Sequence, residues 1–366
     1  MLLWRLIGRM NMIQANGDAW KKHSRIVRAA LLNNLPVEMF AALSHKVFAL
    51  IGKGGLKRWD DIAQRVALDA VGASVLGHDF DAITQESDFV LEYNSIMHEI
   101  ANPVYLVMPV LERIFPRRRI IRRIENLVDD FDKLLERKRL DPGEDIMTFL
   151  LREPNMTHTE LRNNMVLLFM AGHDTSAGGL SSLVYFLARH PDMQERARKE
   201  VLETLGPQGE PTVGRLQKLT FVNACVREAL RINTPISYIL PRCSETSVQL
   251  GKYLIPAGTS LNVNVYVIHH HGGYFKDPFT FAPDRFLDQG KSDASDDAWV
   301  PFGTGPRQCP ARNFAIYEQR CLIAMLLREY RWTLPDDSIH KDGLHNAFSP
   351  FALTLPHDLE VVFTKL

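Results

Sequence analysis

Residues 302–311 read FGTGPRQCPA and carry the strongest signal in the chain. Two glycines and a proline indicate a tight, shaped loop, because glycine reaches backbone angles that other residues avoid. The residues that follow, 312–323, predict a helix, and Pro310 suits a first turn, where its missing N–H costs nothing. Cys309 is therefore predicted at a helix N-terminus. Unpaired N–H groups and the helix dipole favour a thiolate there, and a thiolate is a metal ligand.

The offsets of the aromatic residue, glycines, arginine and cysteine resemble the heme-ligand loop of the cytochrome P-450 family, the heme-thiolate monooxygenases. The resemblance implies that Cys309 binds the iron of heme b as its metal ligand. It also implies that Arg307 binds a heme propionate, that Phe302 packs beside the sulfur, and that Gly305 belongs to the cofactor-binding loop. The family usually has glycine where Ala311 stands here, and alanine is the smallest alternative. An ordinary buried cysteine is the competing interpretation of Cys309 taken alone.

The composition is that of an ordinary globular protein: 366 residues, 46% hydrophobic and 23% charged. Lysine plus arginine and aspartate plus glutamate number 43 each, which argues against a nucleic-acid partner. The cysteines at 225, 243, 309 and 321 form no close pair, so that neither a zinc knuckle nor a disulfide framework is indicated. The absence of a disulfide pattern predicts that the protein works in a reducing compartment. The sequence has no apolar run of transmembrane length and no secretory signal.

Residues 163–187 form the longest apolar stretch and predict a central buried helix. Its middle is anomalous, since glycines, an acid and two hydroxyl residues interrupt it. Thr175 can hydrogen-bond back to the carbonyl of Ala171 and loosen the helix, so we expect a kink and a polar notch. A kink that serves packing alone is the plainer interpretation. The family resemblance of Ala171, Gly172, Asp174 and Thr175 implies instead that the kink leaves room for dioxygen and that the acid and alcohol deliver protons.

Residues 18–31 predict a second important helix, with Asp18 as its N-cap. By resemblance this is the family's C helix, in which Trp20 and a basic residue four positions later bind a heme propionate. Ser24 occupies that later position here. We therefore expect Trp20 and His23 to take the cofactor-binding role, since Arg25 lies about 140° from Trp20 around the helix.

Three charged residues far apart in the sequence complete the resemblance. Glu228 and Arg231, three apart on a predicted helix, would usually be a weak surface pair. The family joins them to an arginine at the position of Arg285, in a network that supports the core beneath the heme. Arg242, in a strand-like segment, is implied as a further propionate partner.

The other predicted elements are helices over 85–101 and 117–139, a hairpin over 248–259, a strand over 261–267 and a final strand over 358–363. The arginine-rich start of the 117–139 helix predicts a charged helix face meeting a membrane surface. Successive histidines 269–271 indicate a polar segment end. Apolar residues of the predicted substrate pocket are Phe169, Met170, Ile236, Ile239 and Phe351.

The fold predicted is mainly α with small β-sheets, an α+β P-450 fold with a central I helix and a Cys-ligand loop. Residues 1–366 form one P-450 domain that starts shortly before the C helix. The family's N-terminal anchor, first helices and first strands have no counterpart, so we expect an N-terminally truncated form whose strands at 249–267 present an open edge.

The function implied is a heme-thiolate monooxygenase that inserts one atom of O2 into an apolar organic substrate. Electrons would come from NADPH–cytochrome P-450 reductase or a similar donor, docked on a basic face of Lys21, Lys22, Arg25 and Arg28. The full-length family member implies the endoplasmic reticulum membrane, to which the missing N-terminal part would attach it. Two alternatives stay open: a catalytically impaired heme-binding fragment, and a reductase-independent enzyme of rearrangement or dehydration.

Overall fold

The computed structural model describes residues 2–32, 35–85, 87–287, 296–348 and 354–366. The architecture is mainly helical with small antiparallel sheets, as the sequence predicted. Phe351, one of the predicted pocket residues, lies outside the described residues.

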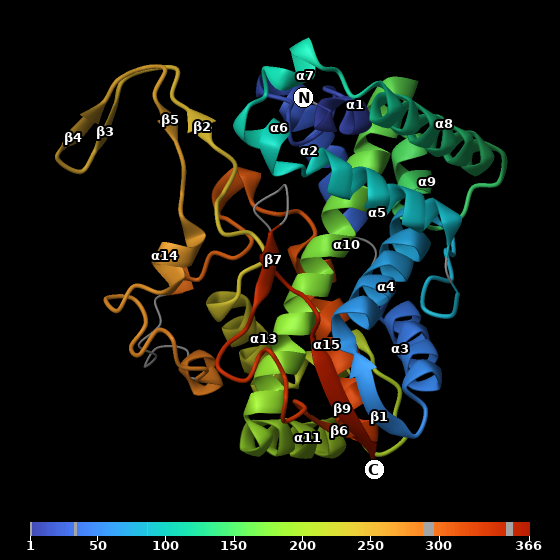
Figure 1. The fold of residues 1–366 in the computed structure, drawn as a ribbon, viewed down its shortest axis with the longest axis vertical. Helices are drawn as coiled ribbons and strands as arrows, with labels where there is room; N and C mark the ends of the chain where they lie inside the picture. The colour runs from blue at the N-terminus through green and yellow to red at the C-terminus, as the bar shows by residue number, and fades with distance from the viewer. Residues whose placement is uncertain (1, 33–34, 86, 288–295, 349–353) are drawn as a thin grey trace.

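The helix α10, His158–Arg189, runs through the centre of the molecule (Figure 1). Thr157 and Glu160 start it with a capping box, in which each side chain bonds the backbone N–H of the other residue. Helices α4 (Trp59–Val71), α13 (Thr220–Ile232) and α15 (Arg312–Glu329) pack against it. The predicted central helix is thus confirmed, although α10 extends beyond residues 163–187 at both ends.

The other helices surround this centre, and the predicted helices over 85–101 and 117–139 are confirmed as α5 and α8. Their bounds are α1 Leu3–Ile7, α2 Gly17–Leu32, α3 Val37–Ile51, α5 Asp88–Ile100, α6 Pro103–Val107, α7 Leu111–Ile114, α8 Arg118–Leu140, α9 Ile146–Leu151, α11 Pro191–Leu205, α12 Val213–Gln217 and α14 Val265–His269. Shorter turns are the π-helical η1 Gly72–Leu76 and the 3-10 segments η2 Pro283–Phe286, η3 Asp296–Ala298 and η4 Gly305–Arg307.

A three-stranded antiparallel sheet in the order β1-β9-β6 joins distant parts of the chain. The strands are β1 Gly54–Arg58, β6 Tyr330–Thr333 and β9 Glu360–Lys365. Gly54 pairs with Thr364, and Tyr330 pairs with Lys365. The remaining pairs are β2–β5, β3–β4 and β7–β8, formed by β2 Arg242–Cys243, β3 Val248–Leu250, β4 Tyr253–Ile255, β5 Ser260–Leu261, β7 Asn346–Phe348 and β8 Thr354–Pro356.

Buried apolar side chains form two clusters, and α10 contributes to both. Its first half, up to Met170, packs with α1, α2, α5, α8 and α9. Its second half, from Ala177, packs with α3, α4, α11, α13, α15 and the three-stranded sheet. Residues 171–176, the polar segment singled out from the sequence, belong to neither cluster. The segment therefore lies where the two apolar cores meet.

Two sequence predictions about strands have opposite outcomes. The hairpin predicted over 248–259 is confirmed as β3 and β4, and its side chains are largely exposed. The strand predicted over 261–267 is wrong, because only Ser260–Leu261 is strand and Val265–His269 is helix. Asn264 explains the difference, since its side chain accepts the Val267 N–H and so caps the helix. Val265 and His269, one turn apart, are both buried.

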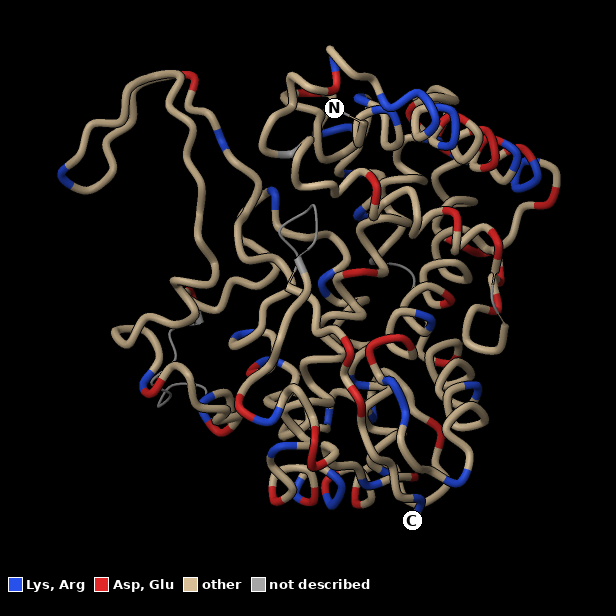
Figure 2. Tube along the Cα trace, in the orientation of Figure 1, with Lys and Arg blue, Asp and Glu red and all other residues tan. Residues whose placement is uncertain are grey.

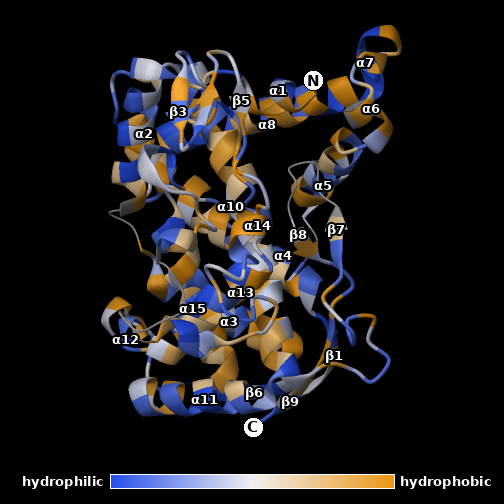
Figure 3. Cartoon of the chain, turned by 90° about the vertical axis from the view of Figure 1, so that its left-hand side faces the viewer, coloured by the Kyte–Doolittle hydropathy of each residue, from blue (hydrophilic) through white to orange (hydrophobic). Residues whose placement is uncertain are grey.

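Charge and hydropathy vary over the surface. A blue row of arginines marks the start of α8 (Figure 2), and α6 and α7 project at one end with apolar residues (Figure 3). In these short helices and their links Val107, Ile114 and Phe115 are 81%, 60% and 66% exposed. Among the described residues, no helix combines the length and apolar character that crossing a membrane requires.

Candidate active site

Hydrogen bonds within the Cys309 loop fix its shape. The Cys309 N–H donates to the Phe302 carbonyl at 2.9 Å, and the Gly303 N–H donates to the Val300 carbonyl at 3.0 Å. Gly303 and Gly305 both have φ of 69°, a left-handed conformation that other residues adopt at a cost. The α15 helix begins at Arg312, with Ala311 as its N-cap residue. Cys309 thus stands just before the helix, close to its predicted place.

Arg28 holds this loop from α2. Its Nη2 donates to the carbonyls of Pro306, at 2.7 Å, and Gln308, at 3.2 Å. Its Nε donates to the Ser24 hydroxyl at 3.1 Å, which positions the guanidinium. Ser24, which stands where the family has a basic residue, therefore supports Arg28 one turn further along the helix. Sequence reasoning gave Arg28 only a place on a docking face.

The Cys309 side chain has accessible surface although protein surrounds it densely. Burial raises the pKa of the Cys309 thiol above its ordinary value, while the Ala311 backbone N–H and the Arg28 charge act in the opposite direction. The Ala311 N–H at the start of α15 thus acts in the expected direction, but burial outweighs it. Cys309 would hold a metal ion as the thiolate, because metal binding releases the proton of a thiol ligand.

An accessible stripe interrupts the otherwise buried middle of α10. Leu168 is half-buried, Ala171 is exposed, and Gly172 and Thr175 are half-buried, a spacing that places them on one side of the helix. Thr175 Oγ1 donates to the Ala171 carbonyl at 2.9 Å, as predicted. Nevertheless α10 is assigned as α-helix without interruption. The predicted hydrogen bond from Thr175 to the Ala171 carbonyl therefore forms without breaking the helix.

Asp174 pairs with His173, the residue before it in α10. Its Oδ1 lies 2.9 Å from Nε2 of His173, and its side chain is 21% exposed. His173 is buried and was not singled out in the sequence.

Arg307 lies against Trp20, and Arg242 is near enough for its charge to act on Arg307. The Arg307 guanidinium lies over the Trp20 ring, 4.4 Å from its centroid, and donates to the Ala15 carbonyl at 2.9 Å and to Asn16 at 3.1 Å. Burial lowers the pKa of Arg307, and the charge of Arg242 lowers it further. Within the described ranges, neither arginine forms an ion pair. A pair of uncompensated cations next to one another is the electrostatic setting that binds an anion.

His23, in contrast, already has partners for both ring nitrogens. Its Nδ1 lies 2.8 Å from Asn164 Nδ2, and its Nε2 lies 3.2 Å from Glu160 Oε1. Its side chain is 2% exposed. The predicted cofactor-binding role of His23 is therefore not supported by its geometry, because it ties α2 to the start of α10. Lys22 is bound to the same glutamate, at 2.8 Å.

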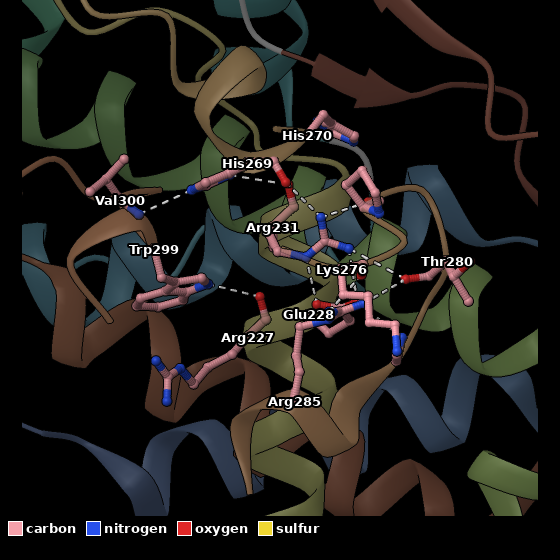
Figure 4. Close-up of polar contacts among 12 residues, drawn as sticks. Arg227, Glu228, Arg231, His269, His270, Lys276, Thr280, Arg285, Trp299 and Val300 are labelled. Atoms are coloured by element: carbon pink, nitrogen blue, oxygen red, sulfur yellow. Dashed lines mark hydrogen bonds and ion pairs between the residues drawn. The ribbon is translucent and has the colours of Figure 1, made fainter. Parts of the chain in front are cut away.

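Glu228, Arg231 and Arg285 meet as predicted (Figure 4). Glu228 Oε2 lies 2.7 Å from Arg231 Nε, and its Oε1 lies 3.1 Å from Arg285 Nε. The Glu228 and Arg231 side chains are completely buried. Arg231 also donates to the carbonyls of His269 and Pro278, each at 2.7 Å.

His269 connects this network to the segment that leads into the Cys309 loop (Figure 4). Its Nδ1 is 3.1 Å from the Arg231 carbonyl, and its Nε2 accepts the Val300 N–H at 3.0 Å. Burial, followed by the Arg231 charge, lowers the pKa of His269 to about 3. Sequence reasoning had treated the histidine run as a polar segment end. The spacing of Val265 and His269, one helical turn apart, could have indicated a short helix with both residues on its buried side.

The predicted pocket residues separate into two groups. Phe169 belongs to the core, because it is completely buried and its ring packs against those of Tyr93, Phe80 and Phe131 at 5.0, 5.6 and 5.5 Å. Met170 is also buried, whereas Ile236 and Ile239 are half-buried. Phe302 is half-buried too, and its ring lies 6.0 Å from that of Trp299.

The donor set fits a heme. It combines an accessible sulfur with nearby cations that have no counter-ion, and heme offers an iron and two propionates. The model for the family described as cytochrome P450 matches residues 7–358. The chain belongs to the cytochrome P450 family.

Similar proteins agree with this assignment. Cytochrome P450 4F5 of Rattus norvegicus is 27% identical over 363 residues, which cover 88% of this chain and 68% of the relative. Leukotriene-B4 omega-hydroxylase 3 of Mus musculus is 27% identical over 361 residues, covering 89% and 69%. Cytochrome P450 4F8 of Homo sapiens is 28% identical over 356 residues, covering 87% and 68%.

Solved structures share the fold. The heme domain of cytochrome P450DA matches with a TM-score of 0.87 and 21% identity, covering 100% of this chain and 81% of its own. The retinoic acid-bound cyanobacterial CYP120A1 matches with a TM-score of 0.84 and 23% identity, covering 99% and 82%. This P450 is accordingly an oxidoreductase of the heme-thiolate monooxygenase class, with heme b as its cofactor.

Proposed function

We propose that this P450 inserts one oxygen atom of O2 into an apolar organic substrate, with electrons from a reductase of the NADPH–cytochrome P450 type. The observation that carries the proposal is the Cys309 sulfur, which is accessible on a loop held both by Arg28 and through Val300. Heme held by the Cys309 thiolate would supply the oxygen chemistry, because a thiolate ligand donates electron density that favours O–O cleavage.

Several residues of the chain would hold the cofactor. Arg307 and Arg242 would bind the propionates, with Trp20 packed against Arg307. Phe302 and Gly305 would shape the loop beside the sulfur. Ala171 is exposed and its methyl side chain is small, which would leave room for dioxygen at this surface, whereas Gly172 makes room for the Val71 side chain of α4.

Asp174 and Thr175 are proposed to supply protons at this surface. The Thr175 hydroxyl donates to the Ala171 carbonyl, so its oxygen lone pairs remain free to accept a hydrogen bond. Asp174 is partly exposed and can pass a proton toward it. A positioned acid of this kind contributes about 10²- to 10⁴-fold to proton-dependent steps.

The substrate is proposed to be apolar because half-buried Ile236 and Ile239 come from the segment that ends next to the loop. A side chain added at Gly303 would meet Ile239 Cδ1 at 3.7 Å, which places Ile239 beside the Cys309 loop. The mouse relative is a leukotriene-B4 omega-hydroxylase, so long-chain fatty acids and oxygenated fatty acids are the first substrates to screen.

The surroundings are proposed to be the endoplasmic reticulum membrane. The exposed apolar residues of α6 and α7 adjoin the arginine-rich start of α8, a combination that suits an anionic lipid surface. For the reductase, Lys21 and Arg25 are exposed on α2, although Lys21 pairs with Asp18 at 2.9 Å, whereas Lys22 and Arg28 are bound to Glu160 and to the Cys309 loop.

A reduced carbon monoxide difference spectrum tests the proposal first. The wild-type protein should show the thiolate type of Soret band, and Cys309→Ser should lose it. If the wild type lacks that band, the assignment of Cys309 fails. Turnover with reductase and NADPH then separates a monooxygenase from an impaired heme binder and from an enzyme that needs no reductase. Thr175→Ala should divert reducing equivalents to peroxide, and unchanged coupling would remove Thr175 from the mechanism.

A further inference from the structure

His173 lies at the junction of α10 and α5, shielded from solvent. Its side chain is 3% exposed and sits between two aromatic rings. The Tyr93 ring on α5 is 5.4 Å away in an edge-on arrangement, and the Phe169 ring, one turn earlier on α10, is 5.6 Å away. An imidazole in such an apolar setting needs hydrogen-bond partners for both of its nitrogens.

Those partners determine where its protons lie. Nδ1 is 3.3 Å from the Phe169 carbonyl, which can only accept, so Nδ1 carries a proton. Nε2 is 2.9 Å from Asp174 Oδ1. An unprotonated Nε2 and an ionised carboxylate are both acceptors, and two acceptors do not bond at this distance. One proton therefore lies between Nε2 and Oδ1.

The environment keeps that proton in place. Burial lowers the pKa of His173, but the charge and hydrogen bond of Asp174 and the Phe169 carbonyl outweigh it, so that the pKa is raised overall. The titratable group that faces the pair from α5 is Tyr93. Its hydroxyl has no hydrogen-bond partner in the described part of the chain, and burial and the Asp174 charge raise its pKa well above the ordinary value. Tyr93 thus remains a neutral donor beside the pair.

We propose that His173 and Asp174 store one shared proton, and that His173 thereby controls when the Asp174 carboxyl can deliver a proton toward Thr175. His173 is then a positioning residue, because it acts through Asp174. The inference rests on the proposed function, because that function includes proton delivery by Asp174.

The transfer balances without any other reactant. The Nε2–H bond breaks, an O–H bond forms on Asp174, and the electron pair remains on the nitrogen of neutral His173. Asp174, whose side chain is 21% exposed, then passes the proton outward and later returns one from solvent to Nε2. The pair is thereby reset through its one accessible member.

Nitrogen-15 NMR of histidine-labelled holoprotein tests the shared proton directly. The reduced carbon monoxide complex is diamagnetic and suits the measurement, and His173→Gln identifies the signal. At neutral pH both ring nitrogens of His173 should be protonated. Asp174→Asn should lower the midpoint of its titration by about one pH unit or more, a tenfold loss of proton affinity. An unprotonated Nε2 in the wild type, or a midpoint indifferent to Asp174→Asn, overturns the proposal.

Coupling of NADPH oxidation to product tests the control of delivery. His173→Gln should uncouple turnover and displace its pH profile, with intact folding shown by an unchanged carbon monoxide band. His173→Asn is the second variant if the glutamine variant does not fold. His158→Gln is the matched control, because His158 also lies on α10 and pairs with an aspartate, Asp132, at 2.9 Å, but is 44% exposed. It should leave coupling unchanged.

The results separate the two proposals. If Asp174→Asn uncouples turnover and His173→Gln does not, His173 has no control over delivery and the inference fails, whereas the proposed function stands. If neither variant changes coupling, delivery by Asp174 fails and the control by His173 fails with it, whatever the NMR shows.

Discussion

His269 Nε2 accepts the Val300 N–H at 3.0 Å while the opposite ring nitrogen bonds the Arg231 carbonyl at 3.1 Å. One neutral imidazole therefore joins the buried Glu228–Arg231 pair to the segment before the Cys309 loop. Val300 in turn accepts the Gly303 N–H, so the connection reaches the loop itself.

Replacing His269 with phenylalanine should destabilise the protein by about 2–4 kcal/mol, because two buried backbone groups lose their partners. Chemical denaturation of the holoprotein measures this, and the heme content after purification should fall as well. His270→Ala is the control, since His270 is half-buried and its Nδ1 bonds the nearby Tyr266 carbonyl, one turn earlier in α14. Equal losses in the two variants would contradict the role given to His269.

His269 should also make the stability of the folded protein sensitive to acid. The pKa of His269 in the folded protein is about 3, below the ordinary 6.5 of a histidine in an unfolded chain. Its contribution to stability is therefore complete above the unfolded value and decreases as pH falls toward about 3, by up to about 1.4 kcal/mol per pH unit. His269→Phe should show a shallower loss of stability between about pH 6 and about pH 4. A slope identical to the wild type's would exclude His269 as its source.

Glu228→Gln should cost about 3–5 kcal/mol, because it leaves the buried Arg231 and Arg285 without their counter-ion. Thermal unfolding followed by circular dichroism provides the measurement. Glu203→Gln is a matched control on α11, where the pair with Lys199 is 3.9 Å long and exposed. The control should change stability by less than about 0.5 kcal/mol.

Arg28→Ala should weaken heme retention and lower stability by about 1 kcal/mol, because the carbonyls of Pro306 and Gln308 lose a charged donor. The ratio of heme to protein after gel filtration measures retention. Arg25→Ala removes an equal charge from the exposed side of the same helix and should leave retention unchanged. Retention reduced equally by both variants would point to net charge as the cause.

Glu318 predicts a dependence on pH of the opposite sign to that of His269. Burial raises the pKa of Glu318 to about 8, and Ser176 acts in the opposite direction. A raised folded-state pKa gives stability that is complete below the ordinary value of 4.5 and is lost as pH rises through about 8.

Glu318→Gln keeps the shape without the charge, so its melting temperature should match the wild type's at about pH 4 and exceed it by a growing margin as pH rises toward about 8. Glu360→Gln, on the exposed part of β9, should follow the wild type throughout. If Glu318→Gln loses as much stability over this pH range as the wild type does, Glu318 is ionised at neutral pH and this interpretation is wrong.

Sequence reasoning succeeded where a feature depends on neighbouring residues and on a specific pattern. The Cys309 loop, the Asp174–Thr175 segment of α10 and the Glu228–Arg231 pair were all located in this way. Residues whose roles depend on distant partners were missed. Arg28 is 278 residues from Pro306, and His269 is 38 residues from Arg231, so no local pattern shows either contact.

One error and one assignment that the geometry does not support have identifiable physical causes. Alternation over 261–267 predicted a strand, but Asn264 caps a helix whose buried residues lie one turn apart. His23 was assigned to the cofactor because it lies three residues from Trp20. Its partners, Glu160 and Asn164, come from the start of α10, and the sequence of α2 contains no sign of them.

The continuity of α10 constrains how this chain can change over time. One helix contributes to both apolar cores and carries the accessible stripe between them. Each residue inserted into a helix rotates everything beyond it by about 100° and advances it by about 1.5 Å. A single codon gained or lost between Thr157 and Gly172 would therefore turn Thr175 away from its place or pull the second core out of register. We expect substitutions to accumulate along α10, but its length to remain fixed.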